Sequence, residues 1–423
     1  MNRLDVYLHH DLVGHLDRLE HSLLTFSYTP EWVEAGGSRL SASLPVRSEP
    51  FDDREARPYF AGLLPEGRFL RDIARVYAVS ASNAFSMLEA IGGECAGAIT
   101  MVPAGEPLPR DDQPRWMEAE EFRALIAGVA ARPLALIEEA DGLRLSLAGA
   151  QEKLPVIFRE ESIGITRGFP PSTHIMKIPD PRFPGLVANE AYCMILAGMA
   201  GLDAALAVPV AVDPKNHRAG EGEVLVVVRF DREQDTEISH RLHQEDFCQA
   251  MGVVSEEKYE ADGGPGLAEC AGLLRGQSSL PARDLIALVG AVIFNFLIGN
   301  NDAHGKNFSM LREGEGTPRL APLYDLVSTV SFNGLDRRMA MRIGGENRPE
   351  YVRRRHWEGF AEQINVSIRL VEETAQALVS NVREVRDEAR ALLDEGFADQ
   401  AILDEINLQI DRRAGWLEEE LLD

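Results

Sequence analysis

Cysteine is scarce in this sequence, and its cysteines are not paired. Cys95, Cys193, Cys248 and Cys270 are the only four in 423 residues, and no two of them form a C-x-x-C pair. Zinc sites of that type and disulfide-rich folds both need closely spaced or paired cysteines. We therefore predict neither, and we expect four buried thiols in a reducing compartment.

Positive charge is also in short supply. The chain has 43 Lys and Arg residues against 68 Asp and Glu, which gives a net charge of −25 and a pI near 4.9. Proteins that bind nucleic acid through their overall field carry the opposite charge, so this class is not favoured. The basic segment "YVRRRHW" at 351–357 is interpreted as an exposed helix face, and contact with nucleic acid or a partner is the alternative.

Long apolar runs are missing as well. The longest, "LIALVGAVIFNFLIG" at 285–299, is short for a membrane span and contains Asn295. The first residues, "MNRLDVYLHHDLVGHL", alternate like a strand and carry charges where a signal peptide has an apolar segment. From these patterns we expect a cytoplasmic protein with no membrane partner.

The composition is that of a globular protein, with 45% hydrophobic and 26% charged residues. Short strand patterns and a helical segment around 59–78 fill the first hundred residues, and the Pro- and charge-rich stretch at 103–116 is typical of a linker. Strand patterns then dominate to about 231, and helical patterns dominate after 240. A chain of this length usually divides into two or three domains, and we predict them at 1–105, 106–238 and 239–423.

A dense polar cluster, "GNNDAHGKNFSM" at 299–310, follows an apolar helix predicted at 285–298 and capped by Gly299. Asp302 and Asn307 have the D-x-x-x-x-N spacing of a protein-kinase catalytic loop, in which the Asp orients the attacking hydroxyl and the Asn binds Mg²⁺. Lys306 would neutralise phosphoryl charge and His304 would hydrogen-bond nearby. The alternative is a loop that only caps neighbouring helices.

A second carboxylate follows downstream. Two strand-like segments, "NFSML" and "RLAPLYDLV", are joined by a turn, and the second ends near Asp325. In kinases a metal-binding Asp of the D-F-G motif has the same position, and here Y-D-L replaces it. Two carboxylates and an amide suit Mg²⁺ better than zinc. Alternatively, Asp325 is an ordinary turn residue.

Lys177 lies upstream in the apolar strand "THIMKIPD", where an unpaired ammonium would be costly. It is predicted to bind phosphate like the lysine of the kinase V-A-I-K strand, with Glu190 on the next helix as its ion-pair partner. The alternative is a lysine that extends from an edge strand into solvent.

Two further segments complete a nucleotide site in the kinase order. The small residues Ala148, Gly149 and Ala150 form a turn in "SLAGAQEK", where backbone N–H groups can approach phosphates. The segment "VVVRFD" at 226–231 ends the sheet where a kinase has its hinge, so the backbone from Val228 to Phe230 is predicted to meet adenine.

In this order the segments resemble the HipA-type serine/threonine kinases, the toxins of bacterial type II toxin–antitoxin modules. The resemblance covers nearly the whole chain. It rests on "RLSLAGAQEK", "THIMKIP", "NEAYC", "RFDR", "LHQEDFCQAMG", "KYEADGGPG", "DAHGKNFS" and "LAPLYDLVS", with "FSYTPEWV" and "LSASLP" near the N-terminus. It implies an α+β, two-lobed protein-kinase-like fold, with a mixed α/β N-lobe, a mostly helical C-lobe and an extra N-terminal α/β coupling domain.

The resemblance also implies roles for individual residues. Asp302 would be the catalytic base, and Asn307 and Asp325 would hold Mg²⁺. The expected ATP contacts are Ala148, Gly149, Ala150, Gln151, Glu152, Lys153, Lys177, Val228, Arg229, Phe230, His304, Gly305, Lys306, Asn307, Tyr324 and Asp325.

By the same resemblance, the kinase would phosphorylate a translation component, such as glutamyl-tRNA synthetase or another aminoacyl-tRNA synthetase. It would switch itself off by autophosphorylation at Ser146, where added negative charge repels ATP. A HipB-like helix-turn-helix antitoxin would bind it. Contact with operator DNA is expected only through that antitoxin, because "IGGENRPEYV" at 343–352 is shorter and less basic than the family's operator-contacting loop. The hinge also departs from the family, with Val228 where an acidic residue is frequent.

Two other functions remain open from the sequence. A small-molecule kinase of similar fold would place phosphate on a metabolite. An inert co-repressor would only bind an antitoxin, although the presence of Lys177, Asp302, Asn307 and Asp325 disfavours inertness.

Overall fold

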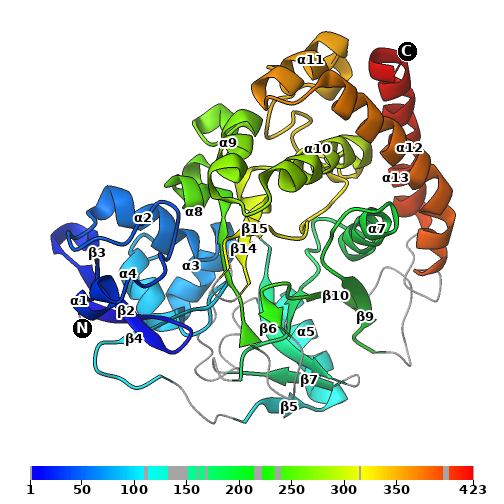
Figure 1. The fold of residues 1–423 in the computed structure, drawn as a ribbon. Coiled ribbons are helices and arrows are strands. Elements are labelled where there is room, and N and C mark those ends of the chain that lie inside the picture. The colour runs from blue at the N-terminus through cyan, green and yellow to red at the C-terminus, as the bar shows by residue number, and fades with distance from the viewer. Residues whose placement is uncertain are drawn as a thin grey trace. The chain divides into compact units, whose positions relative to one another are not determined.

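The computed structural model describes residues 2–108, 113–131, 151–159, 162–166, 170–213, 222–233, 240–313, 316–393 and 400–422. These residues form two compact units (Figure 1). Unit 1 contains residues 1–181, 226–255 and 311–316, and unit 2 contains residues 182–225, 256–310 and 317–423. Helices and sheets are mixed, which confirms the predicted α+β class.

Unit 1 begins with an antiparallel sheet in the order β3-β2-β1-β4. Its apolar face and the neighbouring helices enclose a core that includes Phe26, Phe51 and Phe60, all fully buried. The helical segment predicted around 59–78 is divided in two, because Pro65 cannot continue the hydrogen bonding of the first helix. The elements are β1 (Arg3–Leu8), β2 (Asp11–Arg18), β3 (Leu24–Tyr28), α1 (Pro30–Glu34), α2 (Asp53–Gly62), α3 (Gly67–Val76), α4 (Ala84–Ile91) and β4 (Ile99–Pro103).

A second sheet in unit 1 follows the order β5-β7-β6-β8-β10, with the last three residues of β10 belonging to this unit. Its neighbouring strands β6 and β8 are antiparallel, and their register places Lys153 opposite Lys177. The elements are β5 (Arg115–Met117), α5 (Ala119–Ala131), β6 (Lys153–Arg159), β7 (Ser162–Ile165), β8 (His174–Lys177), β10 (Glu223–Val228), β11 (Arg232–Glu233), β12 (His240–Arg241), β13 (His243–Asp246) and α8 (Phe247–Met251).

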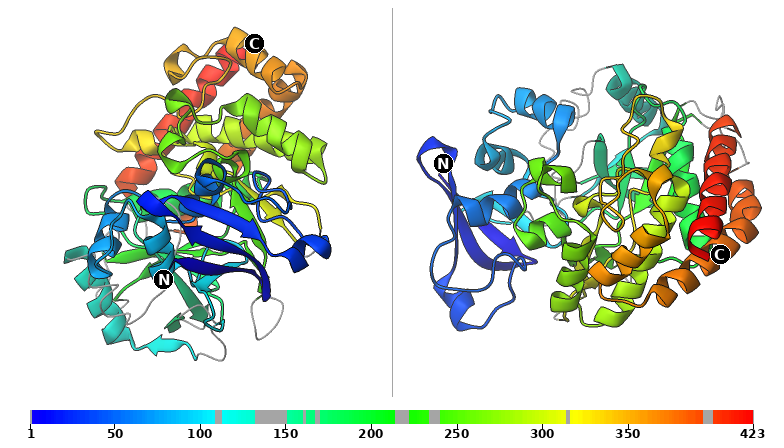
Figure 2. Two further views of the ribbon diagram at one scale, coloured as in Figure 1. Left: turned by 90° about the vertical axis from the view of Figure 1, so that its left-hand side faces the viewer. Right: turned by 90° about the horizontal axis from the view of Figure 1, so that it is seen from above.

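Unit 2 is mostly helical and is built around α10 (Pro281–Ile298), which packs against α9, α12 and α13. The helices α12 and α13 also contact α7, and they lie side by side in Figure 2. The other elements are α7 (Leu186–Met199), β9 (Ala207–Ala211), α9 (Leu267–Gln277), β14 (Ser309–Arg312, of which the first two residues belong to this unit), β15 (Arg319–Leu320), α11 (Arg354–Gln363), α12 (Ile368–Ala391) and α13 (Gln400–Leu417).

The central helix α10 is long and apolar enough to cross a membrane, but 72% of it is buried inside the protein. Burial on all sides identifies it as the core helix of unit 2. It starts at Pro281, which suits a first helical turn, and ends before Gly299, whose φ of 73° closes the helix in the left-handed conformation. The predicted helix and its glycine cap are therefore confirmed.

Candidate active site

The polar loop after α10 is fastened to the helix by a chain of side-chain amides. The buried Asn295 has its Oδ1 2.8 Å from Asn300 Nδ2, and Asn300 Oδ1 accepts a hydrogen bond from the Asp302 N–H at 3.2 Å. Asn300 Nδ2 also lies 3.4 Å from the carbonyl oxygen of Asp325. Buried amides satisfied in this way hold the backbone on both sides of the candidate site.

Asp302 presents an exposed carboxylate at this loop. Its Oδ1 accepts a 2.9 Å hydrogen bond from the hydroxyl of Tyr259, which precedes the short helix Glu260–Asp262. The Tyr259 ring in turn packs edge-on against His304, with 5.2 Å between the ring centroids. The carboxylate is therefore open to solvent and held in one orientation, as a proton acceptor needs to be.

Asn307 closes a single 3₁₀ turn, Gly305–Asn307. Its Oδ1 accepts from the His304 N–H at 3.2 Å, and its own N–H donates to the His304 carbonyl at 2.9 Å. His304 and Lys306 are buried, whereas Asn307 is half-buried. The turn thus leaves the Asn307 side chain within reach of a ligand.

Tyr324 joins the two segments that carry the predicted metal ligands. Its hydroxyl donates to the Lys306 carbonyl oxygen at 2.7 Å and lies 2.7 Å from Ser309 Oγ. Tyr324 directly precedes Asp325, and Lys306 directly precedes Asn307. The hydrogen bond between Tyr324 and Lys306 therefore joins the two segments at the residues next to the predicted metal ligands.

Asp325 has a φ of 54°, in the left-handed region that non-glycine residues rarely adopt. Such a conformation costs roughly 1–3 kcal/mol and is kept where surrounding contacts enforce it, often at functional sites. Asn300 and Tyr324 supply those contacts here. The carboxylate of Asp325 is half-buried, and its role as a metal ligand stays a prediction, because Asp also adopts this conformation in ordinary turns.

The donor set of Asn307 and Asp325 fits Mg²⁺. Both offer oxygen, and Mg²⁺ is commonly bound by one or two protein groups together with substrate phosphates and water. Within the described ranges, no group of three or more His, Cys, Asp or Glu side chains could hold a metal ion. A protein-only metal cage is therefore not formed by that part of the chain.

Unit 1 carries the predicted phosphate-binding strand. Lys177 is buried with 4% of its surface exposed, and Lys153 is its direct cross-strand partner. Directly opposed residues of antiparallel strands share one face, so two ammonium groups lie on the same side of the sheet. Just before β6, Gln151 Nε2 donates to the Ile178 carbonyl at 3.4 Å, and the Ile178 N–H donates to the Glu152 carbonyl at 3.0 Å.

Glu190, the predicted partner of Lys177, is almost fully buried in α7 of unit 2. Lys177 belongs to unit 1, and their ion pair stays a prediction. The neighbouring Asn189 was not singled out from the sequence, but it makes two bonds with Ser328, at 2.8 Å to its N–H and 3.2 Å to its carbonyl. Asn189 thus anchors the segment that follows Asp325 to α7.

Arg229, predicted to lie at the hinge, has a structural role that its sequence position did not reveal. Its guanidinium is 2% exposed and bonds to Asp231 at 2.7 and 2.8 Å, and to Ser172 Oγ at 2.9 Å. Its N–H donates to the Thr173 carbonyl at 3.1 Å. The side chain of Arg229 is therefore committed to the fold of unit 1. Val228 and Phe230 beside it are half-buried.

The remaining predicted residues Ser146, Ala148, Gly149 and Ala150 lie outside the described residues.

Two family models match the chain. The model described as HipA N-terminal domain matches residues 4–102, and the model described as HipA-like C-terminal domain matches residues 145–389.

Curated relatives match most of the chain. It is 41% identical over 390 residues to the protein Y4mE of Sinorhizobium fredii, which covers 90% of each chain. It is 32% identical over 365 residues to the serine/threonine-protein kinase toxin HipA of Shewanella oneidensis, which covers 82% of this chain and 80% of that protein. The solved complex of Shewanella oneidensis HipA with HipB and operator DNA matches with a TM-score of 0.82 and 25% identity, covering 99% of this chain and 97% of that one.

Proposed function

The chain belongs to the HipA family of kinase toxins, and we propose that it is an ATP- and Mg²⁺-dependent serine/threonine protein kinase with Asp302 as its catalytic base. The observation that carries this proposal is the linkage within unit 2, where Tyr259 orients Asp302 and Tyr324 joins the segments of Asn307 and Asp325. In the proposed organisation, residues 1–105 are a coupling domain, 106–238 the N-lobe and 239–423 the C-lobe. The protein acts in the cytoplasm.

In the proposed reaction, Asp302 accepts the proton of the attacking hydroxyl while Tyr259 keeps its carboxylate in place. Asn307 and Asp325 hold Mg²⁺, which neutralises negative charge on the phosphate oxygens when it is bound. Lys306 lies beside Asn307 and adds positive charge at the transferring group.

The lysine pair of unit 1 supports ATP binding. Lys153 and Lys177 share one face of the sheet, where their ammonium groups would be suited to contact the phosphates of ATP. Residues 148–152, His304, Gly305 and Tyr324 would complete the proposed phosphate contacts. Because the Arg229 side chain is buried in its own ion network, adenine would be met by backbone atoms of residues 228–230.

Two carboxylate variants separate the proposed roles. We expect Asp302→Asn to bind a fluorescent ATP analogue with Mg²⁺ as the parent does, but to lose about 10²–10⁴-fold in phosphoryl transfer. Asp325→Asn should instead weaken binding of the Mg²⁺-nucleotide complex. Asp336→Asn, at an exposed Asp of the same unit, is the matched control and should change neither quantity. Unchanged transfer in Asp302→Asn would remove this residue from the mechanism.

Autophosphorylation at Ser146 is proposed as the off-switch. About two negative charges close in sequence to residues 148–152 would repel the phosphates of ATP. We expect Ser146→Ala to stay active after preincubation with Mg²⁺–ATP, while the parent chain loses activity as phosphate accumulates. Equal loss of activity in both proteins would rule out this switch.

The proposed substrate is an aminoacyl-tRNA synthetase, with glutamyl-tRNA synthetase first among them. The family resemblance motivates this choice, and incubation of purified synthetases with the chain and labelled ATP tests it. Label on one synthetase that is absent with Asp302→Asn is the expected result. A small-molecule kinase would instead label a metabolite fraction and no protein.

A HipB-like helix-turn-helix antitoxin is the proposed partner, since the Shewanella relative was solved with HipB and operator DNA. Direct DNA contact by residues 343–352 is not proposed, because this segment carries one arginine against two glutamates. We expect a gel shift of operator DNA by the antitoxin, enhanced by this chain, and no shift by this chain alone. An inert co-repressor would give the same shifts but no phosphoryl transfer.

A further inference from the structure

Unit 2 contains a cavity of about 370 Å³ that no step of the proposed reaction uses. Its lining includes Arg337, Arg412 and Arg413, with Glu350 as the one carboxylate, and an aromatic surface from Phe296 and Trp416. This volume lies in the range of pockets that hold small organic molecules. The cavity also reaches Asn301, the residue before Asp302.

The lining carries positive charge in a strongly acidic chain. Three arginines face one glutamate there, although the whole chain has a net charge of −25. In the part of the chain that the structure describes, Arg337, Arg412 and Arg413 form no ion pair with a carboxylate. This differs from Arg229 and Arg232, whose buried charges are matched by acids.

Arg413 is the most constrained of the three arginines. Its Nη1 donates to the Phe296 carbonyl at 2.8 Å, its Nη2 lies 3.4 Å from Asn301 Oδ1, and its guanidinium lies 5.0 Å from the centre of the Phe296 ring. Burial lowers the pKa of Arg413 to about 10, so the group is still charged at neutral pH. Its hydrogen bonds go to neutral groups, and Glu350 is the lining carboxylate whose charge acts on it. Three arginines against one acid still favour an incoming anion.

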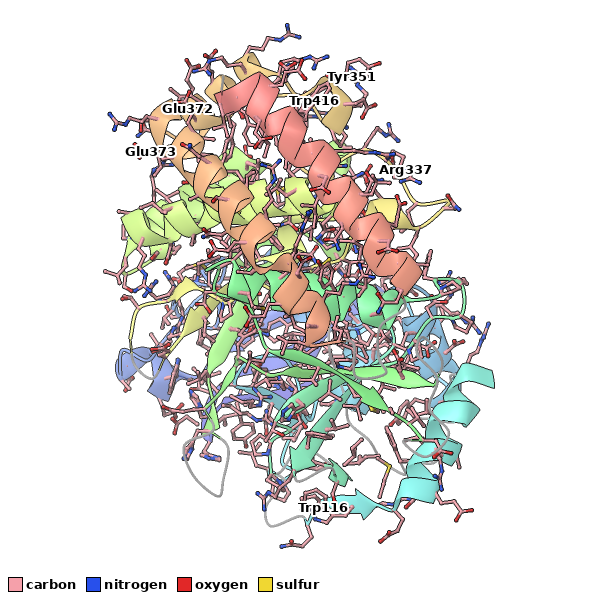
Figure 3. The ribbon with its side chains drawn as sticks, turned by 90° about the vertical axis from the view of Figure 1, so that its right-hand side faces the viewer. Trp116, Arg337, Tyr351, Glu372, Glu373 and Trp416 are labelled. Atoms are coloured by element: carbon pink, nitrogen blue, oxygen red, sulfur yellow. The ribbon has the colours of Figure 1, made fainter. Side chains whose placement is uncertain are left out.

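Other lining groups are fixed in place. Trp416 donates from Nε1 to the Val352 carbonyl at 2.7 Å, and the guanidinium of Arg353 lies 4.2 Å from the centre of its ring. Arg337 donates from Nη1 to the Val330 carbonyl. Figure 3 shows Trp416 on α13 and Arg337 on the segment that follows β15. Since a guanidinium has five donors, Arg337 and Arg413 keep further donors for a ligand.

We propose that this pocket binds a small organic anion, whose carboxylate or phosphate group lies among the guanidinium groups of Arg337, Arg412 and Arg413. The planar forks of arginine suit both kinds of group, and Phe296 and Trp416 would cover an apolar or aromatic body. The pocket is separate from the proposed ATP site, although it shares Asn301 with the loop that carries Asp302.

The test is calorimetric titration of the full chain with three probes that share a benzene ring. Benzoate and phenyl phosphate are anions, and benzylamine is the cationic control. The titrations are run with saturating Mg²⁺ and a non-hydrolysable ATP analogue, and repeated on Lys177→Gln, so that binding of phosphate at the ATP site is recognised. The variants are Arg337→Gln and Arg412→Gln, and Arg369→Gln is the control because Arg369 is an exposed arginine paired within α12.

We expect at least one anion to bind once per chain, and benzylamine not to bind. The dissociation constant of the bound anion should rise about tenfold in Arg337→Gln and Arg412→Gln, which is the loss typical of one charge-assisted hydrogen bond. It should stay unchanged in Arg369→Gln and Lys177→Gln. If benzoate binds more tightly, the ligand carries a carboxylate, and if phenyl phosphate binds more tightly, it carries a phosphate. If Arg337→Gln does not fold, the exposed Arg412 gives the decisive variant. No anion binding, equal binding of benzylamine, or binding lost only in Lys177→Gln would overturn the proposal.

Discussion

Replacement of Asp231 by Asn tests whether the buried ion network around Arg229 and Arg232 stabilises unit 1. Asp231 accepts bonds from Arg229 Nε and Nη2 at 2.8 and 2.7 Å and from the Gly97 N–H at 2.7 Å, and it lies 3.0 Å from Arg232 Nη1. Glu94 is the other acid of the network, at 3.4 and 3.5 Å from the two guanidinium groups. The side chains of both arginines are no more than 1% exposed.

The expected cost follows from the charges that remain. In Asp231→Asn two buried guanidinium groups share a single carboxylate, and the loss of one partner from a buried ion pair typically costs about 3–5 kcal/mol. Asn keeps one acceptor oxygen, so we expect about 3 kcal/mol, which is roughly a hundredfold in the folding equilibrium. The exposed Asp336–Arg338 pair gives the matched control Asp336→Asn, for which we expect less than about 1 kcal/mol.

Urea-induced unfolding followed by circular dichroism at pH 7 measures both variants. The charges of Arg229 and Arg232 lower the pKa of Asp231 despite the opposing effect of burial. Its stabilising contribution is therefore complete above the pKa of an unfolded Asp and declines only in more acidic solution. The difference between Asp231→Asn and the parent chain should consequently be the same at pH 7 and pH 5.5. A loss no larger than that of Asp336→Asn would refute the role of this network.

Three further predictions concern two residues near the polar loop of unit 2 and one buried carboxyl group of unit 1. Tyr259→Phe removes the 2.9 Å bond to Asp302 and should lower phosphoryl transfer about tenfold with an unchanged melting temperature; unchanged transfer would show that Asp302 needs no orientation. Asn300→Ala breaks the amide chain and should cost roughly 1–3 kcal/mol in urea unfolding; a neutral result would exclude it as an anchor. Burial raises the pKa of Glu245 from 4.5 to about 7 despite a bond from Ser41, so folding binds a proton and stability falls as pH rises across that window. The free energy of unfolding of Glu245→Gln minus that of the parent should therefore be larger at pH 8 than at pH 5. An equal difference at both pH values would contradict the pKa shift of Glu245.

Local signals in the sequence predicted a large part of this architecture. The helix preceding the polar loop, its Gly299 cap and the mostly helical character of the chain after residue 240 follow from residue periodicity and backbone preference, which depend on near neighbours. The order of the segments also led to the family. These signals act over a few residues, and for that reason they can be read without the fold.

The contacts that orient the site could not be predicted, because their partners are distant in the chain. Tyr259 is 43 residues from Asp302, and nothing in the spacing links them. Arg229 was expected at a nucleotide hinge, but its guanidinium turns to Glu94, 135 residues away. Asn295 looked like an interruption of an apolar helix, and its amide proved to be the first link to Asn300. Only the folded chain reveals such pairings.

The most direct measurement of the central claim is the intact mass of the purified chain after incubation with Mg²⁺–ATP, beside Asp302→Asn, with peptide mapping of both and of their starting material. We predict one added phosphate on Ser146 of the parent chain and none on Asp302→Asn. Starting material without phosphate that stays unmodified in both proteins would contradict autophosphorylation. Equal phosphorylation of both would contradict the role of Asp302 as the base.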